Sequence, residues 1–250
     1  MLERAGLAGG AANIGRYLRW QPDGAWGWFD DDGLVGMVTL LRFGDVGFVG
    51  CMAVEPRRQG RGLGRALLEH AHDAGARSGV TTFLLEATPL GARLYGRLGY
   101  VVESETMVVE RPGSTTATPA LAPLAADRAA IHALDRVATA SPRRAMIDGL
   151  IDDCAGTTER SAGALAAFGL LVGTRLGPVI ARDPGAGRAV VDRLAGSAMS
   201  ATVSLTNEPA VAAVQANGFV ELRRLDRMRR GPALPSRPDW IWALASPGAG

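Results

Sequence analysis

The chain has 250 residues, 47% of them hydrophobic and 21% charged, and a formal net charge of +2. This length suits one large or two small domains, and the hydrophobic fraction is enough to build a core. All 27 residues counted as Lys plus Arg are arginine. The absence of lysine excludes a Schiff-base lysine and a phosphate-binding loop of the nucleoside triphosphatase type.

The same features limit the compartment and the partners. No apolar run approaches the ~20 residues that cross a bilayer, and the N-terminus lacks the pattern of a signal peptide. With only Cys51 and Cys154 present, a disulfide framework is not expected, and a reducing cytoplasm fits best. We therefore expect a cytoplasmic protein with no membrane and no nucleic-acid partner, since no basic stripe accompanies the slight charge.

The first half reads as alternating strands and helices. Apolar runs separated by turns predict three strands between residues 24 and 54, followed by a glycine- and arginine-rich loop over 56–64. The elements expected next are a helix over 65–75, a strand over 82–87, a helix over 89–99 and a strand over 100–109.

Residues 111–123 have the composition of a linker. This predicts a domain over 1–112, a linker over 113–124 and a second domain over 125–250. Because helices and strands alternate in both halves, we expect an α/β (mixed α+β) architecture. The second half should contain helices over 125–137, 145–154, 187–194 and 209–216 and strands over 164–172, 177–181, 202–205, 219–228 and 240–244.

The glycine-rich loop is suited to binding an anion. Glycines in Gln59-Gly60-Arg61-Gly62-Leu63-Gly64 let backbone N–H groups approach a ligand, and the helix that follows adds unpaired donors and partial positive charge. A solvated surface turn would look the same from glycine spacing alone. A dinucleotide site would place an acidic residue ~20 residues on, near Glu86, but the strand before this loop is the third of a meander rather than an opening strand.

Two motifs in the right order resemble the GNAT acyltransferase superfamily. The first runs from Val54-Glu55-Pro56 through the loop to Leu67-Leu68, and the second comprises Leu85-Glu86-Ala87-Thr88 and Leu94-Tyr95-Gly96-Arg97-Leu98-Gly99-Tyr100. The resemblance implies a central, mostly antiparallel sheet flanked by helices, with acetyl-CoA (acyl-CoA) as co-substrate and no metal. Thr88 departs from the asparagine common in the family. The family's opening strand and one early helix are missing from the front, or are supplied from elsewhere in the chain.

The resemblance also implies roles for single residues. Tyr95 matches the tyrosine that protonates the leaving thiolate, and Glu86 matches a general base that takes a proton from an amine acceptor. A solvated, edge-facing Glu86 is the alternative. Cys51 as a nucleophile has no histidine partner in view, so a small buried hydrophobe fits it better. The residues expected to bind the cofactor are Met52, Ala53, Val54, Gln59, Gly60, Arg61, Gly62, Leu63, Gly64 and Arg65, with backbone N–H groups near Ala53 and Val54 meeting the oxyanion.

The second half resembles a divergent copy of the first. Residues 182–189 align with 59–66, and Asn217-Gly218-Phe219 aligns with Leu98-Gly99-Tyr100. Val214 and Leu205 then stand where the first half has Tyr95 and Glu86. We therefore expect tandem GNAT folds with one working site, and Trp240 and Trp242 as a contact between the halves.

The sequence gives one expected function and one alternative, and it leaves the oligomeric state open. An N-acetyltransferase acting on a small-molecule or peptide amine is expected. A sensor or scaffold that binds acyl-CoA without catalysis is the alternative. A homodimer is left open.

Overall fold

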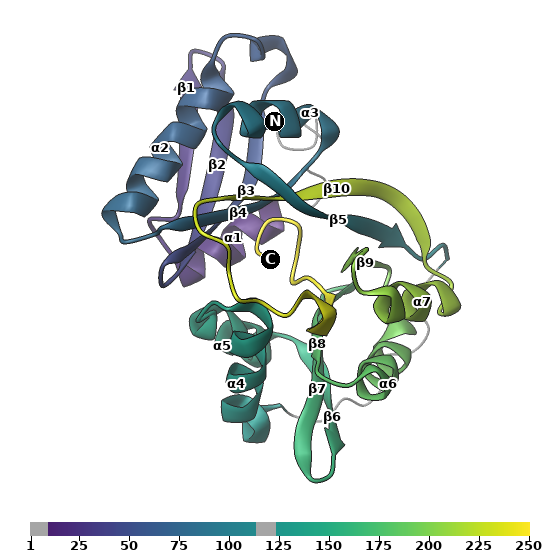
Figure 1. The fold of residues 1–250 in the computed structure, drawn as a ribbon. Helices are drawn as coiled ribbons and strands as arrows, with labels where there is room; N and C mark the ends of the chain where they lie inside the picture. The colour runs from purple at the N-terminus through teal and green to yellow at the C-terminus, as the bar shows by residue number, and fades with distance from the viewer. Residues whose placement is uncertain (1–9, 114–123) are drawn as a thin grey trace.

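The computed structural model describes residues 10–113 and 124–250, so most of the predicted linker lies outside the described residues. The first half contains a three-stranded meander and then alternates helix and strand (Figure 1). Its elements are α1 (Gly10–Trp20), β1 (Ala25–Asp30), β2 (Gly33–Phe43), β3 (Val46–Val54), α2 (Leu63–Arg77), β4 (Thr82–Ala87), α3 (Pro89–Arg97) and β5 (Val101–Glu110).

The second half repeats this order after two helices of its own. Its elements are α4 (Arg128–Thr139), α5 (Arg144–Asp153), β6 (Ala155–Ser161), β7 (Ala164–Val172), β8 (Arg175–Ala181), α6 (Pro184–Ala195), β9 (Ser200–Ser204), α7 (Glu208–Ala216), β10 (Val220–Arg230) and β11 (Ile241–Ala243). The predicted mixed α/β architecture is confirmed. Single-turn 3₁₀ helices occupy Pro56–Arg58, Ala125–Asp127 and Pro238–Trp240.

Two elements escaped the sequence analysis. The strand β6 consists mainly of small and polar residues, and it forms because β7 offers an antiparallel partner along its whole length. The helix α1 lies in a segment with two glycines, and its Tyr17 is buried against residues far along the chain. Both elements are held by tertiary contacts rather than by a strong local pattern.

The strands of both halves form one sheet, in which β10 of the second half pairs with the first half and β5 of the first half pairs with the second. The order is β1-β2-β3-β4-β10-β5-β9-β8-β7-β6. The strand β10 lies antiparallel between β4 and β5, with Arg227 opposite Glu86. In turn β5 pairs with β9 of the second half, with Thr106 opposite Ser204. Figure 1 shows β5 and β10 crossing side by side between the two halves.

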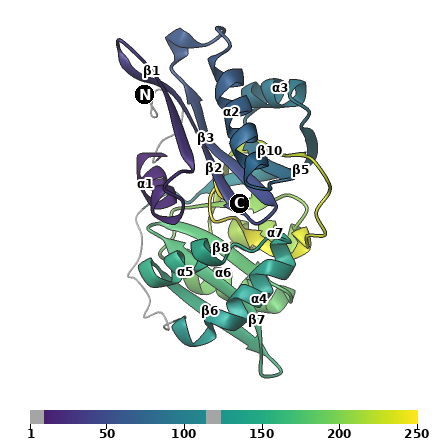
Figure 2. The same ribbon diagram turned by 90° about the vertical axis from the view of Figure 1, so that its left-hand side faces the viewer.

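The hydrophobic cores follow this exchange. One core, beneath α2 and α3, contains Met228 of β10. A second core, around α6 and α7, contains Met107 and Val109 of β5. Figure 2 shows α2 and α3 on the same face of the first half's strands. Each half therefore buries apolar side chains on a strand that the other half supplies.

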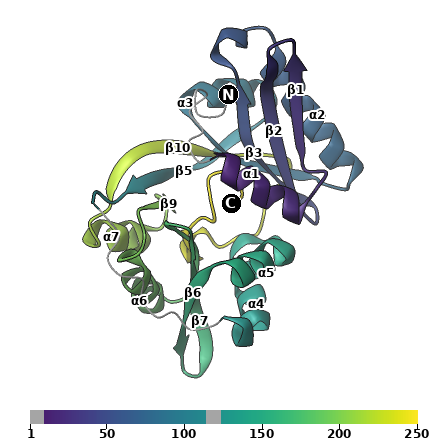
Figure 3. The same ribbon diagram turned by 180° about the vertical axis from the view of Figure 1, so that it is seen from behind.

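The third core joins the opposite face of the first half to the second half. It combines Phe48 and Leu84 of the first half with residues of α4, α5 and the last residues of the chain. The C-terminal segment reaches β3 so closely that a Cβ on Gly50 would lie 2.3 Å from the carbonyl oxygen of Gly248. Figure 3 shows α1 and the C-terminus at this junction. Segments from elsewhere in the chain thus cover this face of the first half together with α1.

Candidate active site

The strands β3 and β4 part from each other and leave an opening in the first half of the sheet. They pair in parallel at only three positions, from Val46 with Thr82 to Phe48 with Leu84. Beyond Phe48, β3 has no strand partner on this side among the described residues. An opening of this kind exposes backbone N–H and C=O groups that must find another partner. We call it the first cleft.

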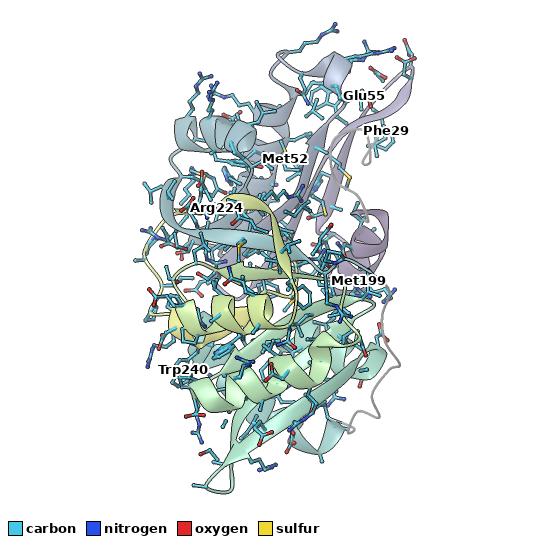
Figure 4. The ribbon with its side chains drawn as sticks, turned by 90° about the vertical axis from the view of Figure 1, so that its right-hand side faces the viewer. Phe29, Met52, Glu55, Met199, Arg224 and Trp240 are labelled. Carbon is cyan, nitrogen blue, oxygen red and sulfur yellow. The ribbon has the colours of Figure 1, made fainter. Side chains whose placement is uncertain are left out.

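A bulge lies at Cys51, on the stretch of β3 that borders this cleft. Cys51 has a φ of 45°, and the pairing of β2 with β3 shifts by one residue between Met37 and Thr39. After the bulge, Met52 and Val54 pack against the core beneath α2 and α3. Figure 4 shows Met52 in the first half. A bulge of this type interrupts the regular ladder, and Met52, Ala53 and Val54 follow it on the stretch of β3 that no longer pairs with β4.

The N-terminus of α2 lies at the wide end of the cleft and has no side-chain cap. Gly62 is the N-cap residue with a φ of 82°, and Gly60 has a φ of 76°, so both need the freedom of glycine. A Cβ on Gly64 would lie 3.4 Å from both Met52 and Leu94, which places α2, β3 and α3 together. The first N–H groups of α2 are therefore free to bind an anion.

The arginines of this loop differ in their availability. Arg58 pairs with Asp30 at 3.0 Å and with Asp32 at 2.6 Å. Arg65 pairs with Glu69 at 2.9 Å. Arg57 and Arg61 are exposed and have no ion-pair partner within the described part of the chain. Arg57 and Arg61 can therefore reach a bound phosphate without breaking an existing pair, while Gln59 donates a hydrogen bond to the carbonyl of Val54 at 3.1 Å.

Tyr95 lies on α3, in the same core as Leu67 and Ala87, and is 7% exposed. Its ring packs 5.8 Å from that of Tyr100. Burial raises the pKa of Tyr95 to about 12, so the phenol keeps its proton at neutral pH. No described residue accepts its proton in a hydrogen bond.

Glu86 is buried in a polar cluster on the opposite face of β4. Its carboxylate is 0% exposed, receives a hydrogen bond from Thr106 at 2.7 Å, and pairs with Arg227 at 2.7 Å. Burial raises the pKa of Glu86, while the adjacent Arg227 guanidinium and the Thr106 hydroxyl act to lower it. The alternative of a solvated, edge-facing Glu86 is therefore wrong.

Arg227 and Thr106 were not singled out from the sequence. Arg227 belongs to β10, and only the exchange of strands between the halves brings it beside Glu86. Its guanidinium also lies 5.7 Å from the ring of Phe48, where β3 and β4 begin to part. No local pattern indicates this position, because the pairing joins residues 141 positions apart.

Cys51 and the histidines have structural surroundings. Burial raises the pKa of the Cys51 thiol to about 11, which disfavours a thiolate nucleophile at neutral pH. His72 accepts a hydrogen bond from Arg230 at Nδ1, so its Nε2 donates to the Tyr100 hydroxyl at 2.8 Å. Within the described ranges, no group of three His, Cys, Asp or Glu residues is close enough to hold a metal ion.

The equivalent cleft of the second half is filled by the chain itself. The strands β8 and β9 pair at only two positions before they part. The strand β11 enters this space, pairs with β8 at Val179 and Ile180, and Leu244 donates to the carbonyl of Thr202 at 2.8 Å. A Cβ on Gly187, which aligns with Gly64, would lie 2.2 Å from the ring of Trp242.

The two tryptophans predicted as a contact between the halves lie in different cores. Trp242 lies in the core around α6 and α7, which also contains Met107 and Val109 of β5. Trp240, labelled in Figure 4, packs at the edge of the core that joins the halves.

The other positions of the second half also depart from those of the first. The carboxylate of Asp183 caps α6 by accepting from the N–H of Ala186 at 2.8 Å, which places a negative charge where α2 offers free donors. Val214 is fully buried at the position of Tyr95. The second half thus lacks both an open cleft and an available helix N-terminus.

Comparisons with known proteins agree with this architecture. Models described as "Acetyltransferase (GNAT) domain" match residues 22–102 and residues 131–243. A putative acetyltransferase from Pyrococcus horikoshii superposes with a TM-score of 0.81 at 20% identity, over 96% of this chain and 84% of that one. A GCN5-related N-acetyltransferase from Sphaerobacter thermophilus gives 0.61 at 18% identity, over 90% and 88%.

At these identities the superpositions establish the fold rather than the acceptor. No helix of the described residues is both long and apolar enough to cross a bilayer. With two matched domains, a shared fold and an open cleft in one half, the chain belongs to the GNAT acetyltransferase superfamily as a two-domain member.

Proposed function

We propose that this protein is an acetyl-CoA-dependent N-acyltransferase with one site per chain, in the first cleft. The observation that carries the proposal is the contrast between the two clefts. The first has an uncapped α2 beside it and borders the core that contains Tyr95, whereas β11 fills the second and Asp183 caps the helix beside it. Residues 1–112 supply the cofactor site, and residues 125–250 act as a non-catalytic domain.

The cofactor would lie along the cleft with its pyrophosphate at the wide end. The amides that begin α2, together with Gln59, Gly60, Arg61, Gly62, Leu63, Gly64 and Arg65, would hold the phosphates. The pantetheine arm would run past Met52, Ala53 and Val54 toward the narrow end, where backbone N–H groups of β3 would meet the thioester oxygen. The acyl group would then lie near Phe48.

The reaction would be a direct attack of an amine on the thioester carbonyl. The acceptor first gives up a proton to Glu86, a C–N bond then forms, and the C–S bond breaks as the thiolate receives a proton from Tyr95. Because the pKa of Tyr95 is about 12 and that of a thiol about 8.5, this donation is favourable only if Tyr95 regains a proton from the attacking nitrogen. Tyr95 would therefore relay a proton from the attacking nitrogen to the thiolate, with no net loss of its own proton.

Calorimetry with acetyl-CoA and a thiol-release assay with a panel of amines test the proposal. We expect one cofactor per chain and steady release of coenzyme A with at least one amine. Two equivalent binding sites, or none, would contradict it. Binding without turnover on any amine would instead support an acyl-CoA sensor or scaffold.

A further inference from the structure

A cavity between the two halves has the properties of an acceptor pocket. Its volume is about 290 Å³, near the lower end of the range for small-molecule sites. Thr106 and Glu103 of β5 line it, together with Ser204, Thr206 and Ser236 of the second half. Arg227 forms part of the wall, so the cavity reaches the cluster that contains Glu86.

Arg227 connects this cavity to the narrow end of the first cleft. Its Nη1 atom binds Glu86, and its guanidinium lies 5.7 Å from the ring of Phe48, the last residue of β3 that pairs with β4. The side chain is 20% exposed. A guanidinium has five N–H donors. Among the described residues, the Arg227 guanidinium makes one hydrogen bond, to Glu86. Its remaining donors are available to an anion in the cavity.

Thr106 connects the same cavity to the carboxylate of Glu86. Its hydroxyl donates to one oxygen of Glu86, while Arg227 binds the other. The Thr106 hydroxyl and the Arg227 guanidinium are therefore roughly 5 Å apart, since two hydrogen bonds and one carboxylate separate them. A proton can pass from an ammonium to the Thr106 oxygen while the Thr106 proton moves to Glu86, which needs no direct contact between the acceptor and the buried carboxylate.

We infer that the acceptor is a small amine with a carboxylate on the adjacent carbon, bound in this cavity with its carboxylate on Arg227 and its amine beside Thr106. The inference rests on the proposed function. The spacing of Thr106 and Arg227 suits the neighbouring amine and carboxylate of an α-amino acid. The side chain of the acceptor would extend toward Ser204, Thr206 and Ser236. The second half therefore supplies the arginine and most of the hydroxyl groups that select the acceptor.

The test compares α-amino acids with their α-carboxamides in the full-length protein, with the release of coenzyme A from acetyl-CoA as the readout. A charge-assisted hydrogen bond contributes enough for a preference of 10-fold or more in kcat/KM for the free acid. Arg227→Lys should reduce this ratio, because one ammonium cannot bind Glu86 and a ligand carboxylate in the same geometry.

A second pair of variants keeps the test informative if Arg227→Lys does not fold. Ser236→Trp should fill the cavity and raise KM for the acceptor at least 10-fold, with acetyl-CoA affinity unchanged by calorimetry. Ala233→Trp, on the exposed part of the same segment, is the matched control and should behave as wild type. Equal kcat/KM values for the amino acids and their carboxamides would overturn the inference and leave the proposed function standing. A Ser236→Trp enzyme as active as Ala233→Trp would have the same consequence. Cofactor binding without turnover on any amine would overturn the proposed function, and the inference with it.

Discussion

Tyr95 is buried and keeps its proton at neutral pH, and the chemical role proposed for it is separate from cofactor binding. Tyr95→Phe removes one hydroxyl and leaves the ring contact with Tyr100 in place. We expect a loss of about 10²-fold or more in kcat, because general acid catalysis contributes on that order, with little change in acetyl-CoA affinity. Single-turnover rates and calorimetry on the same preparation measure the two effects. An unchanged kcat with the best acceptor would rule out this role for Tyr95.

The carboxylate of Glu86 is both the proposed general base and one partner of a buried ion pair with Arg227. Glu86→Gln should flatten the acidic limb of the pH–rate profile, since the group that must lose its proton is gone. The substitution also leaves the charge of Arg227 without its partner, so the free energy of unfolding should fall. Thr106→Ser is the matched variant, because it keeps the hydroxyl that contacts Glu86 and should keep the acidic limb. A Glu86→Gln enzyme with the wild-type profile would show that Glu86 only positions Arg227.

Gly62 tests the anion site at the start of α2. Gly62→Asp adds a negative charge and a side chain where the pyrophosphate would lie, so acetyl-CoA binding should be lost in calorimetry. Gly79→Asp is the matched control, because Gly79 also has a positive φ, of 86°, and open space around it, but it follows the other end of α2. Equal affinities of the two variants would contradict a phosphate site at Gly62.

At the scale of elements, β10 is tied to α2 through a buried histidine. Arg230 of β10 donates to His72 of α2, which in turn contacts Tyr100 at the start of β5. Burial, and then the charge of Arg230, lowers the pKa of His72 to about 4. A histidine in an unfolded chain has a pKa near 6.5, so between these values the unfolded state binds more protons than the folded state.

The free energy of unfolding should therefore fall as the pH drops from about 6.5 to about 4, by up to about 1.4 kcal/mol per pH unit from this one group. His72→Gln should remove this part of the slope in urea denaturation series at several pH values. His70→Gln, at an exposed position of the same helix, is the control and should keep the slope. If the free energy of unfolding of the His72→Gln protein changed with pH as in the wild type, His72 would not be the source of the pH dependence.

Most elements could be predicted from the sequence, but their partners could not. Alternating apolar residues and turn glycines located strands such as β4 and β7 at their observed ends. The segment of β10 was also recognised as a strand, yet periodicity gives no information on which strands flank it. For this reason the glycine-rich loop before α2 was found from the sequence, whereas Arg227 and the cavity beside it were not found. The filling of the second cleft by β11 was missed for the same reason.

For the whole molecule, the strand exchange bears on whether the first half can exist alone. In a fragment of residues 1–112, β4 would lack β10 on one side, and Met107 and Val109 would lose the core that buries them. An unpaired edge and exposed apolar side chains favour aggregation. We expect this fragment to be poorly soluble or inactive, with expression and turnover measured beside the full chain. A soluble fragment with full activity would contradict this dependence.

The second cleft provides another test at this scale. Val214→Tyr restores the missing tyrosine, but β11 still fills the space between β8 and β9, and Asp183 still caps α6. We expect the variant to bind one acetyl-CoA per chain, as the wild type does, with no gain in turnover. A stoichiometry of two in calorimetry would show that β11 can be displaced.

The exchange also sets the order in which the chain can fold on the ribosome. At a synthesis rate of about 5–20 residues per second, β4 emerges well before β10, which is more than 130 positions later in the chain. During this interval the edge of β4 has no native partner, and β5 can pair locally with it in place of β10. The first half therefore reaches its final pairing only after β10 of the second half has been translated, although it is first in the chain.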